Sequence, residues 1–205
     1  MKRTSAYILS ALVLVALVSA ASYAEDLAGK VLYLQTNLFY EKPTKMFSTN
    51  YHKGKLLPAG TKVKIQLVGS EAETGDAGMG GVAATFGSFP QIVFKTLEGK
   101  VLHKIRYVRN HHDKVKLNDL ASMYFKETDP LKSSAYAGFT NKEKDAIKKG
   151  VVTEGMSKEA VIMAWGYPPQ HQTPSTEYNS WIYWYSRYVR KIVEFDDNGR
   201  VKRVL

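Results

Sequence analysis

The chain has 205 residues, with 29 Lys and Arg against 19 Asp and Glu, a formal net charge of +10, and no cysteine. The absence of cysteine excludes disulfides, thiolate metal sites and the lipid-bearing cysteine that follows the signal of a bacterial lipoprotein. The length allows one large or two small domains, each with its own core.

Residues 1–24 have the pattern of a secretory signal peptide. Lys2 and Arg3 form a basic tip, residues 6–18 are apolar, and Ser22-Tyr23-Ala24 is a small-x-small cleavage signal. The apolar run is shorter than the roughly 20 residues that a membrane-spanning helix needs. The sequence therefore predicts an exported protein.

Removal of this leader leaves 27 basic and 19 acidic residues, a net charge of +8. Outside the cytoplasm, the acidic partners of a basic protein are anionic lipid headgroups, acidic polysaccharide and acidic protein surfaces, because nucleic acid is normally absent there. We therefore expect envelope proteins as partners, with weak, salt-sensitive contact to an anionic lipid surface and no nucleic-acid binding.

The first half of the mature chain favours strands. Four segments are β-branched and partly alternating, namely residues 30–35, 61–68, 91–96 and 100–108. Turn residues separate them at Pro58-Ala59-Gly60 and at Glu98-Gly99. Short strands joined by turns pair in antiparallel fashion, because a parallel pair needs a crossover helix. We predict a small barrel-like β-domain of Src-homology-3 type.

A helix is predicted at the end of this half, over residues 115–125, where Leu117, Leu120, Ala121 and Tyr124 recur at helical spacing. The small β-domain with its terminal helix is thus expected to occupy residues 25–125. Residues 126–138 contain Asp129-Pro130 and Ser133-Ser134 and are interpreted as a linker.

Residues 139–205 begin with the capping-box pattern Thr140-Asn141-Lys142-Glu143, which predicts a helix up to about Lys149 that ends at Gly150. Ser157 is expected to cap a second helix, which ends at Gly166 before Pro168. Strands follow, so the predicted order is helix, helix, strand, strand, strand. The fold class expected for the whole chain is α+β.

The most aromatic of these strands is expected over residues 181–186. Side chains alternate along a strand, so Trp181, Tyr183 and Tyr185 share one face, which we interpret as core, and Ile182 and Trp184 share the other. Two helices cover only one face of a three-stranded sheet. The second face must therefore meet the N-terminal half, another protein or a lipid surface, and we predict partner contacts at Trp184, Tyr188, Arg190 and Lys191.

Residues 140–204 resemble the SmpA/OmlA (BamE-like) domain family. The matching features are Gly155-Met156-Ser157-Lys158-Glu159-Ala160-Val161, the helix stop Gly166-Tyr167-Pro168, the strand Trp181-x-Tyr183, and Phe195-x-x-Asn198-Gly199-Arg200-Val201. The resemblance implies a helix-helix-three-strand domain over residues 139–205 and a non-enzymatic role in binding envelope proteins, including components of the outer-membrane β-barrel assembly machinery. It also implies a periplasmic protein, soluble or peripherally attached to the outer membrane. Two features depart from the family: the missing cysteine and the additional residues 25–125.

The sequence contains few features that indicate a metal site, a nucleotide site or a catalytic site. His111-His112-Asp113 is the one histidine cluster, but adjacent side chains on an extended segment point apart, whereas metal ligands converge from separate elements. The glycine-rich segment 69–87 formally contains G-x-G-x-x-A at residues 78–83, without the strand and helix that a dinucleotide site requires. The motifs G-x-S-x-G and H-E-x-x-H are absent. We predict no enzyme activity, no metal and no cofactor.

Two alternatives belong to other functional classes. In the first, the N-terminal β-domain binds a cell-wall glycan or peptide through aromatic residues such as Tyr33, Phe39, Tyr40 and Tyr51. In the second, an envelope hydrolase uses His111, His112 or Asp113. The glycine-rich segment either closes over a ligand or simply connects two strands, and the sequence does not distinguish these roles.

Overall fold

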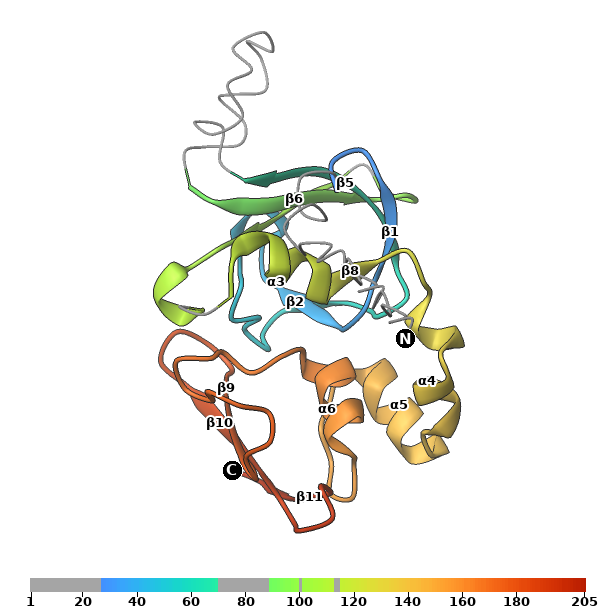
Figure 1. Cartoon of the computed structure of the whole chain (residues 1–205), viewed down its shortest axis with the longest axis vertical. Coiled ribbons are helices and arrows are strands. Elements are labelled where there is room, and N and C mark those ends of the chain that lie inside the picture. Colours follow the sequence, from blue (N-terminus) through green and yellow to red (C-terminus); the bar gives the residue numbers. More distant parts are fainter. Residues whose placement is uncertain (1–26, 70–88, 100, 113–114) are drawn as a thin grey trace, which may run out of the picture.

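The computed structural model describes residues 27–69, 89–99, 101–112 and 115–205, which form a mixed α+β protein with a curled six-stranded sheet (Figure 1). The predicted signal peptide, almost all of the glycine-rich segment and Asp113 lie outside the described residues. The predicted α+β class is confirmed.

The six-stranded sheet has the order β3-β7-β6-β5-β1-β8. Its long strands are antiparallel and coincide with the four predicted segments: β1 (Val31–Leu34), β5 (Lys62–Gly69), β6 (Gln91–Thr96) and β7 (Leu102–Arg106). The short strands β3 (Met46–Phe47) and β8 (Phe125–Lys126) form the two edges, and β2 (Leu38–Tyr40) pairs with β4 (Lys55–Leu57) in a separate ladder. β3 runs parallel to β7.

The sheet curls around an apolar core in which strand residues alternate. Leu32 and Leu34 of β1 and Val63 and Ile65 of β5 point inward and are buried. Helix α3 (Leu117–Tyr124) confirms the predicted helix and packs Leu120, Ala121 and Tyr124 against the same core.

The segment expected to be a linker, residues 126–138, contains regular structure. It holds the end of β8, the 3-10 helix η4 (Pro130–Lys132) and helix α4 (Ser134–Gly138). The side chains of Asp129 and Ser133 cap these two short helices by accepting hydrogen bonds from Leu131 N and Tyr136 N. The Asp-Pro and Ser-Ser pairs that predict a loop thus act here as helix starts.

The remaining residues form two helices and a three-stranded antiparallel sheet of order β11-β10-β9. The elements are α5 (Asn141–Lys149), α6 (Lys158–Trp165), β9 (Ser180–Trp184), β10 (Arg190–Phe195) and β11 (Val201–Val204). The predicted capping box of α5 is confirmed, and Gly150 ends that helix in the left-handed conformation at φ 65°. Ser157 caps α6 as predicted.

The aromatic residues of β9 divide between the core and the surface. Trp181 and Tyr183 are fully buried among the residues of α6 and β10, as predicted. Tyr185 is not core, because β9 ends at Trp184 and Tyr185 lies in the turn to β10, where its ring is exposed and lies 5.1 Å from Lys191 Nζ. The alternation argument fails there because the strand is shorter than predicted.

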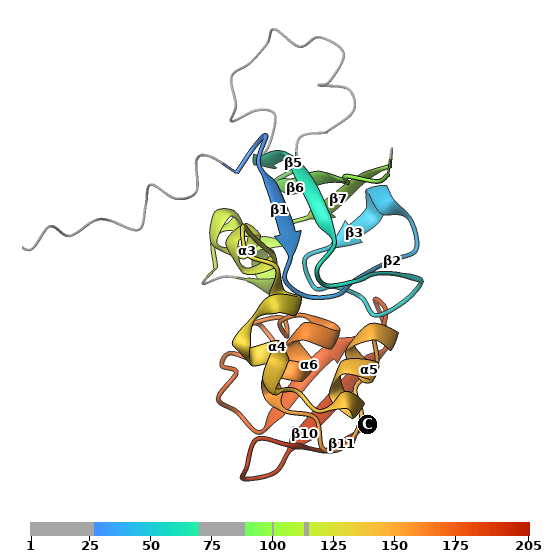
Figure 2. The same cartoon turned by 90° about the vertical axis from the view of Figure 1, so that its right-hand side faces the viewer.

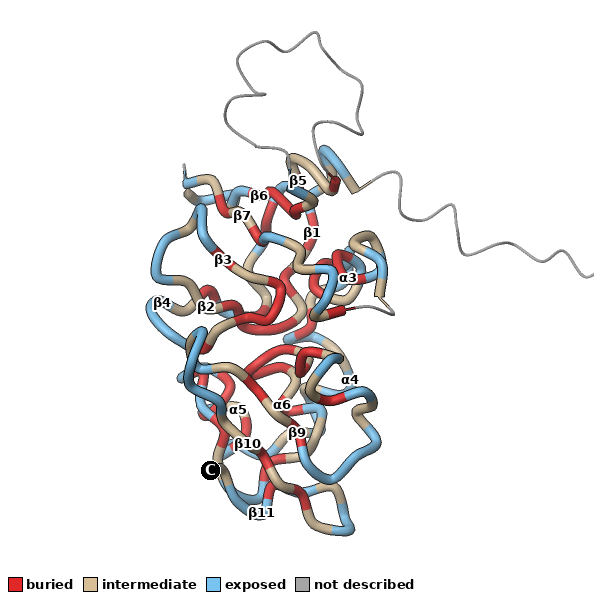
Figure 3. Tube along the Cα trace, turned by 90° about the vertical axis from the view of Figure 1, so that its left-hand side faces the viewer, coloured by how far each residue is buried: buried red, intermediate tan, exposed pale blue. Residues whose placement is uncertain are grey.

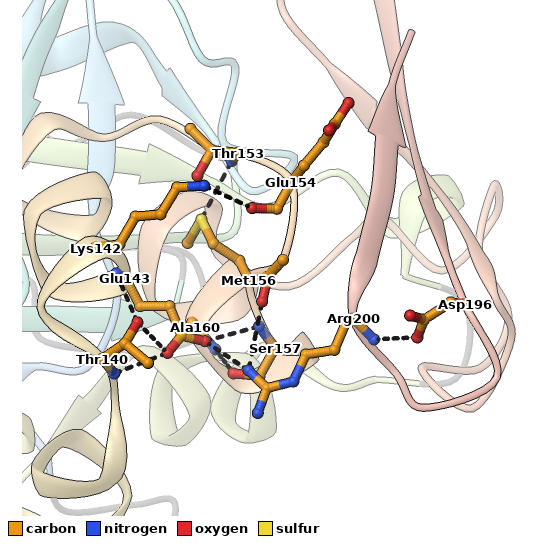
Figure 4. Close-up of polar contacts among 11 residues, drawn as sticks. Thr140, Lys142, Glu143, Thr153, Glu154, Met156, Ser157, Ala160, Asp196 and Arg200 are labelled. Atoms are coloured by element: carbon orange, nitrogen blue, oxygen red, sulfur yellow. Dashed lines mark hydrogen bonds and ion pairs between the residues drawn. The ribbon is translucent and has the colours of Figure 1, made fainter.

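A buried carboxylate joins both helix starts to the β10–β11 turn (Figure 4). Glu143 accepts hydrogen bonds from Thr140 N and Oγ1 at 2.9 Å, from Ser157 N at 2.9 Å and from Arg200 Nη1 at 3.0 Å. Burial alone would raise the pKa of Glu143, but the hydrogen bonds from Ser157 and Thr140 outweigh it and hold the pKa below its usual value.

Replacing Glu143 with alanine should therefore cost about 3–5 kcal/mol of the free energy of unfolding at pH 7, because it leaves buried amides and a guanidinium without their acceptor. Urea unfolding measures this loss, and Glu177→Ala, at an exposed position, should change stability by less than about 0.5 kcal/mol. Since the folded-state pKa is depressed, the advantage of the wild type should shrink as the pH falls below 4.5. An equal advantage at pH 3 would contradict this account.

The two halves meet where the C-terminal ends of α5 and α6 face the N-terminal half (Figures 1 and 2). Asn37 is fully buried at this junction, and its Nδ2 donates to Ile147 O at 2.7 Å and to Ala164 O at 3.1 Å. Its backbone N–H donates to Met163 O at 2.9 Å. The last four carbonyls of a helix have no partner within the helix, so Asn37 satisfies groups at the ends of both helices.

Two further side chains converge on Trp165 O at the end of α6. Asn50 Nδ2 donates to it at 2.8 Å and His52 Nε2 lies 2.9 Å from it. Asn50 adopts a positive φ of 47°, and its Oδ1 accepts from Phe39 N. Figure 3 shows buried segments on both sides of this junction. The junction is thus a continuous polar and apolar contact, and the two halves are held together by directional hydrogen bonds.

Within the described residues, no helix has both the length and the apolar character needed to cross a membrane.

Candidate functional site

A groove of about 860 Å³ lies between the two halves beside this junction. Aromatic rings from both halves line it: Phe39, Tyr40, Phe47 and Tyr51 from the N-terminal half, and Trp184 and Tyr188 from the β9–β10 hairpin. The short strands β2 and β3 and the turns after them position the first four rings, and Phe47 and Tyr51 pack against each other at 5.1 Å. The groove therefore exists only because the halves are joined.

Basic side chains dominate the polar part of the groove lining. Lys45, Lys53, Arg106 and Arg187 line it with a single carboxylate, Glu41. Glu41 Oε1 is bonded to Lys53 Nζ at 2.9 Å, so it neutralises one of the four cations. Arg187 lies over the ring of Tyr188 at 5.5 Å, which leaves the edges of its guanidinium to donate to an anion. The groove thus combines flat apolar surfaces with a positive field.

Trp184 belongs to a stack of four planar groups that spans the junction. The ring of His111, from the N-terminal half, lies 4.4 Å from that of His171, which lies 6.4 Å from Trp184. The guanidinium of Arg190 covers the Trp184 ring at 4.7 Å. Burial and the neighbouring His171 hold the pKa of His111 below its usual value, so the His111 imidazole is neutral in this stack at pH 7.

The indole N–H of Trp184 is buried and has no hydrogen-bond partner among the described residues. Buried donors in folded proteins are normally satisfied. The backbone carbonyl of the same residue does have a partner, since it accepts from His52 N at 3.1 Å. Trp184 is thus held in place by its backbone hydrogen bond and by its ring contacts with His171 and Arg190.

The four predicted contact residues do not share one environment. Trp184 and Tyr188 line the groove, and Tyr188, at 83%, is the most exposed large hydrophobic residue among those that the structure describes. Arg190 lies over the Trp184 ring and is not part of the groove lining. Lys191 is half-buried with its Nζ over the Trp165 ring at 4.9 Å, so its contacts are internal. Two of the four residues therefore line the groove, and a third, Arg190, contacts it only through Trp184.

The residues proposed for a wall ligand also divide. Phe39, Tyr40 and Tyr51 lie in the same groove as Trp184 and Tyr188. Tyr33 instead lines a second groove of about 720 Å³, bordered by Thr128, Asp129 and Tyr167. Two alternatives that the sequence kept apart therefore converge on one site.

In the part of the chain that the structure describes, the adjacent His111 and His112 do not form a metal centre. His111 stacks on His171, whereas the adjacent His112 is buried against Tyr107, with ring centroids 6.2 Å apart. The rings of His111 and His171 are nearly parallel, at 16°, so their in-plane lone pairs do not converge on one ion. No group of three potential ligands occurs among the described residues.

The side chains that join the two halves beside the groove were not predicted from the sequence. Asn37 and Asn50 join the halves, yet their partners at Ile147, Ala164 and Trp165 are 110 or more positions away in the chain. A contact at that separation leaves no local pattern. His52 also belongs to this junction, since its Nε2 lies 2.9 Å from Trp165 O.

Comparison of the chain with protein-family models, with curated proteins and with solved structures finds no match.

Proposed function

We propose that this chain is an exported, non-catalytic binding protein of the cell envelope, which holds a segment of a partner protein in the groove between its halves. The observation that supports this most is the composition of the groove, in which six aromatic rings and four basic side chains face one space. Tyr, Trp and Arg are the residues that most often dominate the free energy of protein interfaces.

The partner segment is expected to be extended and acidic. A groove between two folded units admits a strand or an irregular peptide more readily than a folded surface, and flat rings provide contact area at little entropic cost. With one of four cations already neutralised by Glu41, the remaining three favour carboxylates and steer their approach.

The pathway we propose is outer-membrane protein assembly or envelope integrity. Support comes from the resemblance of residues 140–204 to the SmpA/OmlA (BamE-like) family, whose role is accessory binding. The helices and strands over these residues occur in the order that the resemblance implies. The protein would act in the periplasm, free or peripherally attached to the outer membrane.

In-cell crosslinking of the tagged mature protein, followed by mass spectrometry of captured proteins, tests this proposal. Tyr188→Ala should reduce capture of the partner at least fivefold, because Tyr is enriched among the interface residues whose truncation costs more than about 1 kcal/mol of binding. Tyr178→Ala is the matched control, since Tyr178 is also exposed but lies outside the groove. Equal capture by both variants, or capture of envelope proteins by neither variant nor wild type, would overturn the proposal.

Trp184→Ala separates binding from packing. The variant should lose partner capture more completely than Tyr188→Ala. It should also lower the thermal midpoint, because it removes a ring that contacts both His171 and Arg190. Circular dichroism measures the second effect. If the thermal midpoint falls while crosslinking is unchanged, Trp184 contributes to the packing of the fold and not to partner binding.

A cell-wall glycan is the second candidate ligand, favoured by the position of Phe39, Tyr40 and Tyr51 in the groove. Sugar rings stack on aromatic faces, and uncharged glycan would not need the basic side chains. Sedimentation with purified wall polymer distinguishes the candidates. Arg187→Gln should weaken the binding of an acidic peptide severalfold and should leave the binding of a neutral glycan unchanged.

A further inference from the structure

A second surface of the N-terminal half carries lysines in register across the sheet. In antiparallel pairs, residues directly opposite each other point to the same face. Val31 of β1 is opposite Lys64 of β5, Lys64 is opposite Lys95 of β6, and Lys95 is opposite Leu102 of β7. These four residues therefore form one row on the outer face of the sheet.

A parallel row lies beside the first. Lys126 of β8 is opposite Tyr33, Tyr33 is opposite Lys62, and Leu97 N donates to Lys62 O. Lys62 and Lys64 are two residues apart on β5, so both rows share a face. Figure 2 shows β1 beside β5 in the N-terminal half. We call the two rows, Val31-Lys64-Lys95-Leu102 and Lys126-Tyr33-Lys62-Leu97, the lysine face.

The lysine face contains no acidic residue. Its four lysines, Lys62, Lys64, Lys95 and Lys126, are exposed, and within the described ranges none forms an ion pair. Like charges directly opposite each other destabilise a sheet, so the Lys64–Lys95 pair is unfavourable for folding. Folding alone does not account for a cross-strand pair of lysines in mid-sheet, away from the sheet's edges.

Exposed apolar side chains accompany these charges. Val31 is 48% exposed and Leu97 is 51% exposed, and each lies at one end of a row, with lysines between them. Cations that attract phosphates, combined with apolar side chains that enter the headgroup region, are the features of a surface that lies on a membrane. Soluble anions would use the lysines alone.

We propose that the lysine face docks this protein on the phosphate-bearing headgroups of an anionic membrane surface. The proposal is independent of the groove, because Lys62, Lys64, Lys95 and Lys126 do not line it. An exported chain that has no lipid-bearing cysteine would in this way stay at a membrane while the groove remains open to its partner. Docking is weak and salt-dependent, since each lysine near the surface contributes modestly.

Vesicle sedimentation tests the proposal with the mature chain from Glu25. The protein should bind vesicles that contain 30% phosphatidylglycerol in phosphatidylcholine and should not bind pure phosphatidylcholine, and 0.5 M NaCl should release it. The double variant Lys64→Gln, Lys95→Gln should bind roughly 30-fold more weakly, from the loss of two surface lysines. Its thermal midpoint should stay the same or rise by up to about 3 °C, because the like-charge pair is removed.

The matched control is Lys148→Gln, Lys149→Gln, which removes the same charge from the end of α5 in the other half. It should retain vesicle binding within about threefold. An equal loss in both variants would show that net charge alone acts, and no binding by the wild type would remove the membrane as a partner. Displacement by soluble glycerol phosphate at the same phosphate concentration would show that the face binds single anions, which also overturns docking. Tyr188→Ala should sediment like the wild type, so failure of either surface is seen separately.

Discussion

Asn37→Leu is expected to cost roughly 3–5 kcal/mol of the free energy of unfolding, because leucine keeps the branched shape of asparagine but none of its hydrogen bonds. The change removes the two hydrogen bonds that Nδ2 donates, to Ile147 O and Ala164 O. It also removes the hydrogen bond that Oδ1 accepts from Ala59 N at 2.9 Å. Each buried group left without a partner costs about 1–3 kcal/mol. Asn37 is fully buried, so water does not easily replace its amide as the partner of these three backbone groups.

Urea unfolding followed by two probes measures this effect and its location. All three tryptophans, Trp165, Trp181 and Trp184, lie in the C-terminal half, so fluorescence reports on that half, whereas far-ultraviolet circular dichroism reports on both. In the wild type the two transitions should coincide, because the junction couples the halves. In Asn37→Leu they should move to lower urea and separate.

The control for this variant is Asn141→Leu, at an exposed position in the first turn of α5, which should change stability by less than about 0.5 kcal/mol. A loss below about 1 kcal/mol for Asn37→Leu would mean that the helix carbonyls find other partners. Coincident transitions in that variant would mean that the apolar contacts alone couple the halves.

The long elements were predictable because their signals are local. Residues 91–96 were predicted as a strand and β6 has those bounds. Thr140 with Glu143, and Ser157, mark helix starts through hydrogen bonds to amides only three residues away. These interactions form wherever the segment is placed, so they can be read without knowledge of the rest of the fold.

The short elements were not predictable, since their partners are distant. β3 has two residues, and its pairing of Met46 with Ile105 depends on β7. Tyr185 continues the aromatic alternation of β9, but the turn to Arg190 begins before it. In both cases tertiary packing, rather than local propensity, decides the conformation.

The site was half visible in the sequence. The aromatic residues Tyr51 and Trp184 were recognised as candidate contacts, but for different ligands and on separate domains. Only the junction places them in one groove. A search for buried polar partners cannot begin from Asn37 and Asn50, because asparagine in a loop is ordinary. The information that would reveal them is spatial, and the positive φ of Asn50 becomes apparent only in the folded chain.

His52 should make the folded protein sensitive to acid. It is buried at the junction between the rings of Phe39, Trp165 and Tyr183. Since Trp165 O can only accept, Nε2 carries the hydrogen of the neutral ring, and Nδ1 is buried with no partner among the described residues. Burial lowers the pKa of His52 from 6.5 to about 3, although the bond to Trp165 opposes the shift and Lys191 adds to it.

Between pH 6.5 and pH 3, His52 is therefore protonated in the unfolded chain and neutral in the folded chain. Stability is complete above the unfolded pKa and falls with pH through this window. The loss should be about 2 kcal/mol between pH 7.5 and pH 5, and roughly 4–5 kcal/mol when pH 3 is reached. Urea unfolding across this range gives the profile.

His52→Gln isolates this contribution from the other titrating groups. The glutamine amide can still donate to Trp165 O but does not titrate. Glu143 loses stability only below pH 4.5, and His103 and His111, whose pKa values are also lowered by burial, remain in both proteins. The variant should be less stable than the wild type at pH 7.5 because packing is altered, and the difference should shrink by about 2 kcal/mol at pH 5. If the two stability profiles run parallel instead, His52 is protonated in the folded protein, and the junction tolerates a charge that its burial and its neighbour Lys191 argue against.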